Sequence, residues 1–210
     1  MTTDPTPATV RTMPFGDLSI DFDETVLVPR PWTVQQAQWA NRLLRTVPPG
    51  PVLELCAGAG HIGLATVAGT GRSAVLVDRD AHACDLARTN ASRIAEDVEV
   101  RQGDLHTVLR PDEQFALVVA DPPWVPSRDV VRHPEDPVWA IDGGDDGLDV
   151  ARSCLEVVAR HLADGGRALL QLGSAQQVLE LEHTTTELGL TTNRVHQAQG
   201  GALAEIAHLA

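Results

Sequence analysis

The 210-residue sequence has no lysine and no tyrosine, so arginine supplies all 16 of its Lys and Arg positions. Aspartate and glutamate together number 29, which leaves a formal net charge of −13. A chain this acidic repels a phosphate backbone, so we do not expect nucleic acid as a partner. No apolar run approaches the roughly 20 residues that a membrane span needs, and no signal-peptide pattern opens the chain. We therefore expect a cytoplasmic protein without a membrane partner.

Cysteine is scarce as well, because only Cys56, Cys84 and Cys154 occur, widely spaced and in apolar surroundings. An odd number of isolated cysteines argues against a disulfide framework, so we expect reduced residues in the core. The eight histidines are scattered without the spacing of metal ligands, and no metal site is expected. With 43% hydrophobic and 21% charged residues, the chain can bury a core and is not disordered.

Apolar runs and helical patterns alternate along most of the chain. Strands are expected at 52–55, 74–77, 98–102, 115–120, 167–172, 190–195 and 203–209, and helices at 33–47, 62–68, 81–95, 148–163 and 174–188. Asp80 and Ser174 are expected to cap two of these helices, with Gln177 completing a capping box. Repeated strand–helix units with continuously apolar strands predict an α/β fold, in which helices cover both faces of a mostly parallel sheet. The final two strands, joined by a short Gly-containing link, can pair antiparallel.

The expected organisation has three segments. Residues 1–12 are polar and contain Pro and Thr, which is typical of a flexible terminus. Residues 13–50 predict a small hairpin and, after a Pro-Arg-Pro break, a helix capped by Thr33 that packs on the site. Residues 51–210 are expected to form the main domain. Within it, 121–147 show no clear periodicity, and a loop that long is usually functional or disordered.

A glycine-rich turn follows the first strand of the main domain. Gly58 and Gly60 stand where the backbone would need to approach a ligand closely or adopt a positive φ. Ligands of such sheets bind outside the carboxyl ends of the strands. The run Gly58-x-Gly60-x-x-Gly63, with Asp78 20 residues past Gly58, also satisfies the dinucleotide fingerprint. A nicotinamide dinucleotide is therefore one candidate cofactor.

Acidic residues favour a second candidate, S-adenosylmethionine. Glu54, Asp78 and Asp104 place one carboxylate at or just after the ends of three successive strands. Three acids along one edge of a sheet suit a positively charged sulfonium better than an anionic dinucleotide. A dehydrogenase also usually adds a substrate domain, and few residues remain beyond the sheet. We therefore expect S-adenosylmethionine as the cofactor.

The fourth strand of the main domain ends in Asp121-Pro122-Pro123-Trp124. Two prolines stiffen the turn and remove two N–H groups, which leaves carbonyl oxygens as acceptors. The Asp121 carboxylate and the Pro122 carbonyl can then hold the two hydrogens of a planar nitrogen, and Trp124 can stack on the group that carries it. Such positioning would aim the nitrogen at a methyl group for in-line displacement. We expect Asp121 and Pro122 to be catalytic, and Pro123 and Trp124 to bind substrate.

At these two motifs the chain resembles a known family. Glu-Leu-Cys-Ala-Gly-Ala-Gly (54–60) together with Asp-Pro-Pro-Trp (121–124) is similar to class I methyltransferases that modify nitrogen, and in particular to the HemK-type protein-glutamine N5-methyltransferases. Three further segments resemble that family in the same order: Val-Leu-Val-Pro-Arg-Pro-Trp-Thr (26–33), Asp-Pro-Val-Trp-Ala-Ile-Asp-Gly-Gly-Asp-Asp-Gly-Leu (136–148) and Leu-Gly-Ser-Ala-Gln (172–176).

The resemblance implies a Rossmann-like sheet of seven strands with an antiparallel last strand, S-adenosylmethionine as cofactor and transfer of a methyl group to nitrogen. The residues expected to contact the cofactor are Thr33, Glu54, Ala57, Gly58, Gly60, Asp78, Arg79, Asp104 and Leu105, and Arg30 and Trp32 are expected beside the substrate. The family's usual Asn-Pro-Pro-Tyr is Asp-Pro-Pro-Trp here. Ionised Asp121 can only accept hydrogen bonds, whereas asparagine also donates to an amide carbonyl. An amine would therefore suit Asp121 better than an amide.

The sequence leaves the methyl acceptor open. The main hypothesis is an amine or amide nitrogen of a small molecule or of a peptide or protein side chain. The alternatives are a release-factor glutamine, the N6 nitrogen of adenine in nucleic acid, and a cofactor-binding subunit that needs a partner. A monomer and a homodimer are both compatible with the sequence.

Overall fold

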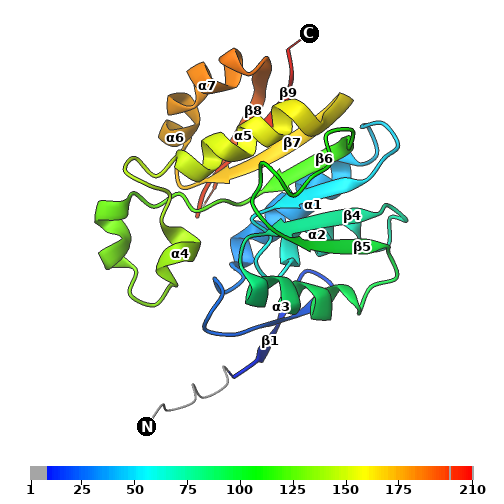
Figure 1. Cartoon of the computed structure of the whole chain (residues 1–210), viewed down its shortest axis with the longest axis vertical. Helices are drawn as coiled ribbons and strands as arrows, with labels where there is room; N and C mark the ends of the chain where they lie inside the picture. Colours follow the sequence, from blue (N-terminus) through cyan, green and yellow to red (C-terminus); the bar gives the residue numbers. More distant parts are fainter. Residues whose placement is uncertain (1–8, 199, 210) are drawn as a thin grey trace.

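The computed structural model describes residues 9–198 and 200–209, and its centre is a seven-stranded sheet (Figure 1). The strand order is β5-β4-β3-β6-β7-β9-β8. The strands are β3 (Val52–Leu55), β4 (Ala74–Asp78), β5 (Val98–Gln102), β6 (Phe115–Ala120), β7 (Leu162–Leu172), β8 (Leu190–Ala198) and β9 (Gly201–His208). The predicted fold class is confirmed, because β3 to β7 run parallel and β9 pairs antiparallel with both β7 and β8.

Helices cover both faces of the sheet, because its strands are apolar on both sides. The helices are α1 (Val34–Leu43), α2 (His61–Val67), α3 (Ala81–Ala91), α4 (Val138–Ile141), α5 (Asp149–His161), α6 (Ala175–Glu180) and α7 (Glu182–Glu187). One buried cluster joins α1, α2 and α3 to strand residues such as Val52 and Val119. The other joins α5 and α6 to the alternate residues, such as Leu53 and Val118. Figure 1 shows α4 standing out from this layered body.

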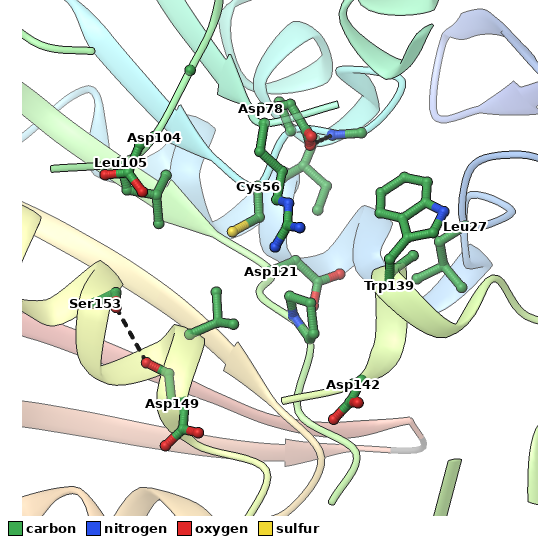
Figure 2. A pocket seen from close by; sticks show the side chains of 18 of the residues that line it. Leu27, Cys56, Asp78, Asp104, Leu105, Asp121, Trp139, Asp142, Asp149 and Ser153 are labelled. Atoms are coloured by element: carbon green, nitrogen blue, oxygen red, sulfur yellow. Dashed lines mark hydrogen bonds between the residues drawn. The ribbon is translucent and has the colours of Figure 1, made fainter. Parts of the chain in front are cut away.

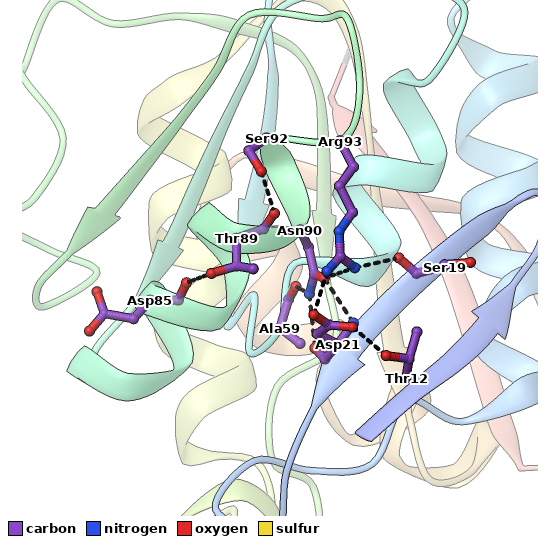
Figure 3. Close-up of polar contacts among 9 residues, drawn as sticks. All are labelled: Thr12, Ser19, Asp21, Ala59, Asp85, Thr89, Asn90, Ser92 and Arg93. Atoms are coloured by element: carbon purple, nitrogen blue, oxygen red, sulfur yellow. Dashed lines mark hydrogen bonds and ion pairs between the residues drawn. The ribbon is translucent and has the colours of Figure 1, made fainter. Parts of the chain in front are cut away.

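An N-terminal hairpin, β1 (Arg11–Phe15) and β2 (Leu18–Phe22), packs on the α1–α3 face. Buried Asn90 of α3 fixes it, accepting from the Asp21 backbone N–H at 2.8 Å and donating to the Asp21 carbonyl at 2.9 Å. The same side chain donates to the Ala59 carbonyl at 3.0 Å, and Arg93 pairs with the Asp21 carboxylate (Figure 3). One asparagine thus ties the hairpin to the glycine-rich turn after β3.

Several element boundaries differ from the sequence predictions. The helix expected at 33–47 extends only over Val34–Leu43, and the hydroxyl of Thr33 donates to the Arg30 carbonyl instead of capping it. The helix expected at 174–188 divides into α6 and α7 at Leu181. The caps Asp80 and Ser174 are confirmed, because each side chain accepts from the backbone N–H three residues on.

The N-terminal segment and the long loop also carry more structure than expected. Strand β1 begins at Arg11, inside the expected terminus 1–12, and residues 1–8 lie outside the described residues. The aperiodic stretch 121–147 contains a 3-10 helix, η2 (Ser127–Arg132), and α4. The three cysteines are free thiols, as expected. Within the described part of the chain, no helix has the length and apolarity to cross a membrane.

Candidate active site

The carboxyl ends of β3, β4 and β6 border a cavity of about 300 Å³, within the size range of small-molecule sites. The predicted residues Ala57, Gly58, Asp78, Arg79, Asp104, Leu105 and Asp121 all line it. Figure 2 shows Asp104 and Leu105 toward one end and Trp139 and Leu27 toward the other, with Asp78 and Asp121 between them. The structure therefore gathers most of the expected cofactor residues around one hollow.

The glycine-rich turn is shaped by its backbone. Gly58 and Gly60 have φ values of 52° and 79°, in the left-handed region that glycine tolerates best. The turn is fastened to the end of the next strand, since the Gly58 N–H donates to Asp78 Oδ2 at 2.7 Å. Asp78 Oδ1 also accepts the Asp80 N–H at 2.9 Å, and burial raises the pKa of Asp78. Each carboxylate oxygen retains a lone pair that can accept from a ligand hydroxyl.

Glu54 lies behind this turn and not in the cavity lining. Its side chain is 2% exposed, on the α1–α3 face of the sheet. A Cβ on Gly63 would come within 2.5 Å of Glu54 Oε2, so the third glycine of the fingerprint makes room for this carboxyl group. Burial raises the pKa of Glu54 to about 8, although the N–H groups of Gly63 and Ile62 oppose the rise. The buried position of Glu54 indicates that its side chain supports the glycine-rich turn from the α1–α3 face of the sheet.

Thr33 and Gly60 are likewise absent from the cavity lining. Thr33 is buried between η1 (Pro31–Thr33) and α1, and Gly60 packs against Leu76, where a Cβ would come within 2.8 Å of the Leu76 side chain. Their assignment as cofactor contacts stays a prediction. Cys56, which the sequence analysis left as a core thiol, does line the cavity, and its Sγ lies 4.0 Å from Cys154 Sγ.

A second cavity of about 230 Å³ is lined by all four residues of the Asp121–Trp124 turn. All six residues expected to be catalytic or to bind substrate line it, namely Arg30, Trp32, Asp121, Pro122, Pro123 and Trp124. Asp121 and Pro123 border both cavities, as do Leu27 and Ala140. The two cavities therefore adjoin at the turn, and a pair of reactants could occupy one cavity each.

Asp121 is half-buried at this junction, and no hydrogen bond holds its carboxyl group among the described residues. Burial raises the pKa of Asp121 to about 7, while the positive charge of Arg30 lowers it. Near neutral pH both of its protonation states are therefore available. When neutral, the group offers one donor and one acceptor; when ionised, it only accepts.

The second cavity is also lined by residues to which the sequence analysis assigned no role. His133, Glu135 and Asp136 bring their potential ligand atoms within 4.8 Å of one another, although the sequence predicted no metal site. Arg30 pairs with Asp136 at 2.5 Å, which partly neutralises this group. Trp139, on α4, is 38% exposed at the mouth of the first cavity. Asp136 and Trp139 belong to the family-like segment 136–148, whereas His133 and Glu135 lie in the aperiodic stretch just before it.

The turn fits against glycine backbone on two sides. A Cβ on Gly143 would come within 2.8 Å of the Pro123 carbonyl oxygen, and one on Gly147 within 2.5 Å of the Trp124 carbonyl oxygen. A Cβ on Gly173 would collide with the Trp124 ring. The segments at 136–148 and 172–176 therefore contribute glycines that allow the turn to pack closely. Such packing can hold a reacting group in a fixed direction.

Comparisons with known proteins agree with this geometry. The family described as Methyltransferase small domain matches residues 39–133. A release factor glutamine methyltransferase from Deinococcus radiodurans is 36% identical over 165 residues, 75% of this chain and 58% of that protein. A ribosomal protein uL3 glutamine methyltransferase from Francisella tularensis is 27% identical over 187 residues, 83% of this chain and 58% of that protein. The chain thus spans less than two thirds of the length of these relatives.

A solved structure shares the fold at lower identity. The 16S rRNA N2 G1207 methyltransferase of T. thermophilus, in complex with AdoMet and guanosine, superposes with a TM-score of 0.68 and 19% identity. The similarity covers 98% of this chain and 52% of that one. At this identity the likeness concerns the fold alone.

Proposed function

We propose that this chain, as a member of the HemK-like class I methyltransferases, transfers a methyl group from S-adenosylmethionine to a nitrogen atom. The observation that carries the proposal is the meeting of two cavities at Asp121 and Pro123. One cavity would hold the cofactor and the other the methyl acceptor. The reaction would take place where the two cavities adjoin.

The first cavity has the chemistry that S-adenosylmethionine requires. Asp78 faces it with acceptor capacity for the ribose hydroxyls, and the positive φ of Gly58 lets the turn approach a ligand. Asp104 and Asp121 add two more carboxylates to a largely apolar lining, which suits a cation with an apolar body. The two predicted segments would then have different roles. Residues 51–210 would bind the cofactor, and the 13–50 segment would contribute Arg30 and Trp32 to the acceptor cavity.

The turn would orient the acceptor. When bound, S-adenosylmethionine supplies an electrophilic methyl group on a positively charged sulfur. The Asp121 carboxyl and the Pro122 carbonyl can each accept a hydrogen from the acceptor nitrogen, which directs its lone pair into the first cavity. Most of the rate would come from this positioning. The proton released after transfer would pass to Asp121 where that carboxyl is ionised, and to solvent where it is neutral.

A protein glutamine is the first candidate acceptor, because the relatives are named for glutamine methylation of release factors and of a ribosomal protein. With the Asp121 carboxyl neutral, its O–H could donate to the glutamine carbonyl while its other oxygen accepts an N–H. A cytoplasmic location is proposed on the same ground, since these named acceptors belong to translation.

An amine is the second candidate, and Asp121 itself favours it. Asparagine at this position would match an amide at any pH, whereas an ionised carboxylate matches the N–H groups of a neutral amine, which has no carbonyl in need of a donor. Glu135 also lines the acceptor cavity and adds negative charge to it, whereas the charge of Asp136 is paired with Arg30.

The test is methyl transfer from labelled S-adenosylmethionine to two peptides that differ at one residue, Gly-Gly-Gln and Gly-Gly-Lys. The wild-type protein and Asp121→Asn would be compared on both peptides. We expect label on at least one of them, with Asp121→Asn shifting the preference toward the glutamine peptide. Failure of calorimetry to detect S-adenosylmethionine binding by the wild-type protein would refute the proposal.

A further inference from the structure

Two glutamine side chains hold the two ends of the Asp121–Trp124 turn. Gln36 lies on α1 and donates from Nε2 to the carbonyl of Ala120, the residue before the turn, at 3.0 Å. Gln177 lies on α6 and donates from Nε2 to the carbonyl of Trp124, the last residue of the turn, at 2.9 Å. The turn itself contains two prolines, which have no N–H with which to fasten it. Its anchoring therefore depends on other groups.

The Gln177 side chain is held at both of its polar atoms. Its Oε1 accepts the N–H of Gly173 at 2.9 Å while its Nε2 reaches Trp124. Gly173 is also the residue whose missing Cβ admits the Trp124 ring. The bridge therefore fixes both the backbone and the ring of Trp124 relative to the end of β7. Neighbouring Gln176, which occupies the final glutamine position of the family-like segment, is exposed and bonds to Glu180.

Gln36 makes a matching bridge at the start of the turn. Its Nε2 also donates to the Leu169 carbonyl of β7 at 3.2 Å, so it ties β6 and β7 together next to Asp121. The side chain is 1% exposed, and its Oε1 finds no partner among the described residues. An unpaired buried oxygen is unfavourable, so a glutamine kept at this position is consistent with a role in positioning.

We propose that Gln177, together with Gln36, is a positioning residue that fixes the Asp121–Trp124 turn between the two cavities. The inference rests on the proposed function, because it assigns these amides to the group that would orient the acceptor nitrogen. Neither side chain would contact the reacting atoms of cofactor or acceptor. Each acts by holding a carbonyl that flanks the turn.

The experiment compares Gln177→Met with Gln176→Met and Ser174→Ala. Gln177→Met keeps the side-chain length but removes both bonds; Gln176→Met is its exposed neighbour control; Ser174→Ala removes the α6 cap without touching Trp124. For Gln177→Met we expect kcat for methyl transfer to fall about 100-fold, since a displacement of about 1 Å can have that effect. The dissociation constant for S-adenosylhomocysteine should stay within about twofold of wild type, as expected for a defect in acceptor positioning.

A second readout is independent of the acceptor. Hydrogen exchange at the Trp124 and Val125 amides should be faster in Gln177→Met and in Gln36→Leu, and unchanged in Gln176→Met. If Gln177→Met loses kcat and melting temperature only as much as Ser174→Ala does, with unchanged exchange at Trp124 and Val125, the positioning role is refuted. If wild type methylates no acceptor, the proposed function fails, and the exchange data still decide whether the turn is held by these glutamines.

Discussion

The two halves of the candidate site are built in different ways. The cofactor half uses short-range connections, such as the bond between the Gly58 N–H and Asp78, 20 residues apart. The acceptor half is assembled over long distances in the chain: Gln36 and Ala120 are 84 residues apart, and Arg30 and Asp136 are 106 apart. The connections of the cofactor half thus run between successive strand–turn–helix units, whereas those of the acceptor half join segments that are far apart in the chain.

This difference suggests how specificity could change within one fold. The turn after β3 must accommodate a constant cofactor, and its glycines and Asp78 follow a recognisable pattern. The acceptor cavity draws on the 13–50 segment, the turn after β6 and the 127–141 segment. Asp121 and Trp124 are an example of such variation, since they stand where the resembled family usually has asparagine and tyrosine.

The substitution Asp121→Ala should give the largest difference between the functions of the acceptor half and the cofactor half. We expect methyl transfer to fall about 1,000-fold, because the substitution removes both the orienting acceptor and the proton acceptor. S-adenosylhomocysteine should bind within about threefold of wild type, as measured by calorimetry. An equal loss of turnover and of cofactor binding would contradict the division of the site.

Asn90→Ala tests the tie between the hairpin and the cofactor turn. It removes three hydrogen bonds to Asp21 and Ala59 and leaves buried backbone groups unpaired. We expect a loss of about 3 kcal/mol in the free energy of unfolding, measured by urea denaturation. Thr89→Ala, one residue earlier and exposed, is the control. A loss below that of Thr89→Ala would mean that the hairpin is not held by Asn90.

Asp78→Asn is the counterpart of Asp121→Ala in the cofactor half. The amide keeps one oxygen for the Gly58 N–H but loses charge-assisted bonding to ligand hydroxyls. We expect the dissociation constant for S-adenosylmethionine to rise about 30-fold, with kcat at saturating cofactor within about threefold of wild type. Unchanged affinity would place the cofactor elsewhere.

The pH dependence of kcat distinguishes between the two candidate acceptors. Burial raises the pKa of Asp121 to about 7, so the carboxyl is mostly neutral below pH 7 and ionised above it. If the acceptor is a glutamine amide, kcat should fall about tenfold per pH unit above pH 7 as the Asp121 O–H donor is lost. If it is an amine, kcat should not fall above pH 7, because ionised Asp121 accepts its N–H and the amine itself must be unprotonated to attack. Asp121→Asn should abolish the fall, and a fall that persists in Asp121→Asn would show that another group controls it.

The sequence predicted the sheet well, because the sheet rests on local patterns, and it also predicted many of the residues that the fold brings to one cavity. Apolar strands alternating with helices suffice to predict the parallel sheet. Six of the nine residues expected to contact the cofactor line the first cavity. Glu54 shows where the pattern misleads, since an acid at a strand end can turn to the opposite face and support the loop.

The acceptor half was only partly predictable. Asp121, Pro122 and Trp124 were visible as a motif, but Gln36 and Gln177 were not, because their partners are carbonyl groups distant in the chain. Gln177 was noticed only as part of a capping box, and its side chain in fact reaches Gly173 and Trp124. Thr33 was expected to cap a helix and instead bonds within its own turn, since η1 precedes α1. Contacts of this kind follow from tertiary packing.

The most direct test of the account is a crystal structure of the protein with S-adenosylhomocysteine. We expect the ribose against Asp78 and the sulfur facing Asp121 and Pro122, so that a methyl group on it would lie about 3 to 3.5 Å from a nitrogen in the second cavity. A nucleoside seated outside the first cavity, or a sulfur turned away from Asp121, would contradict it.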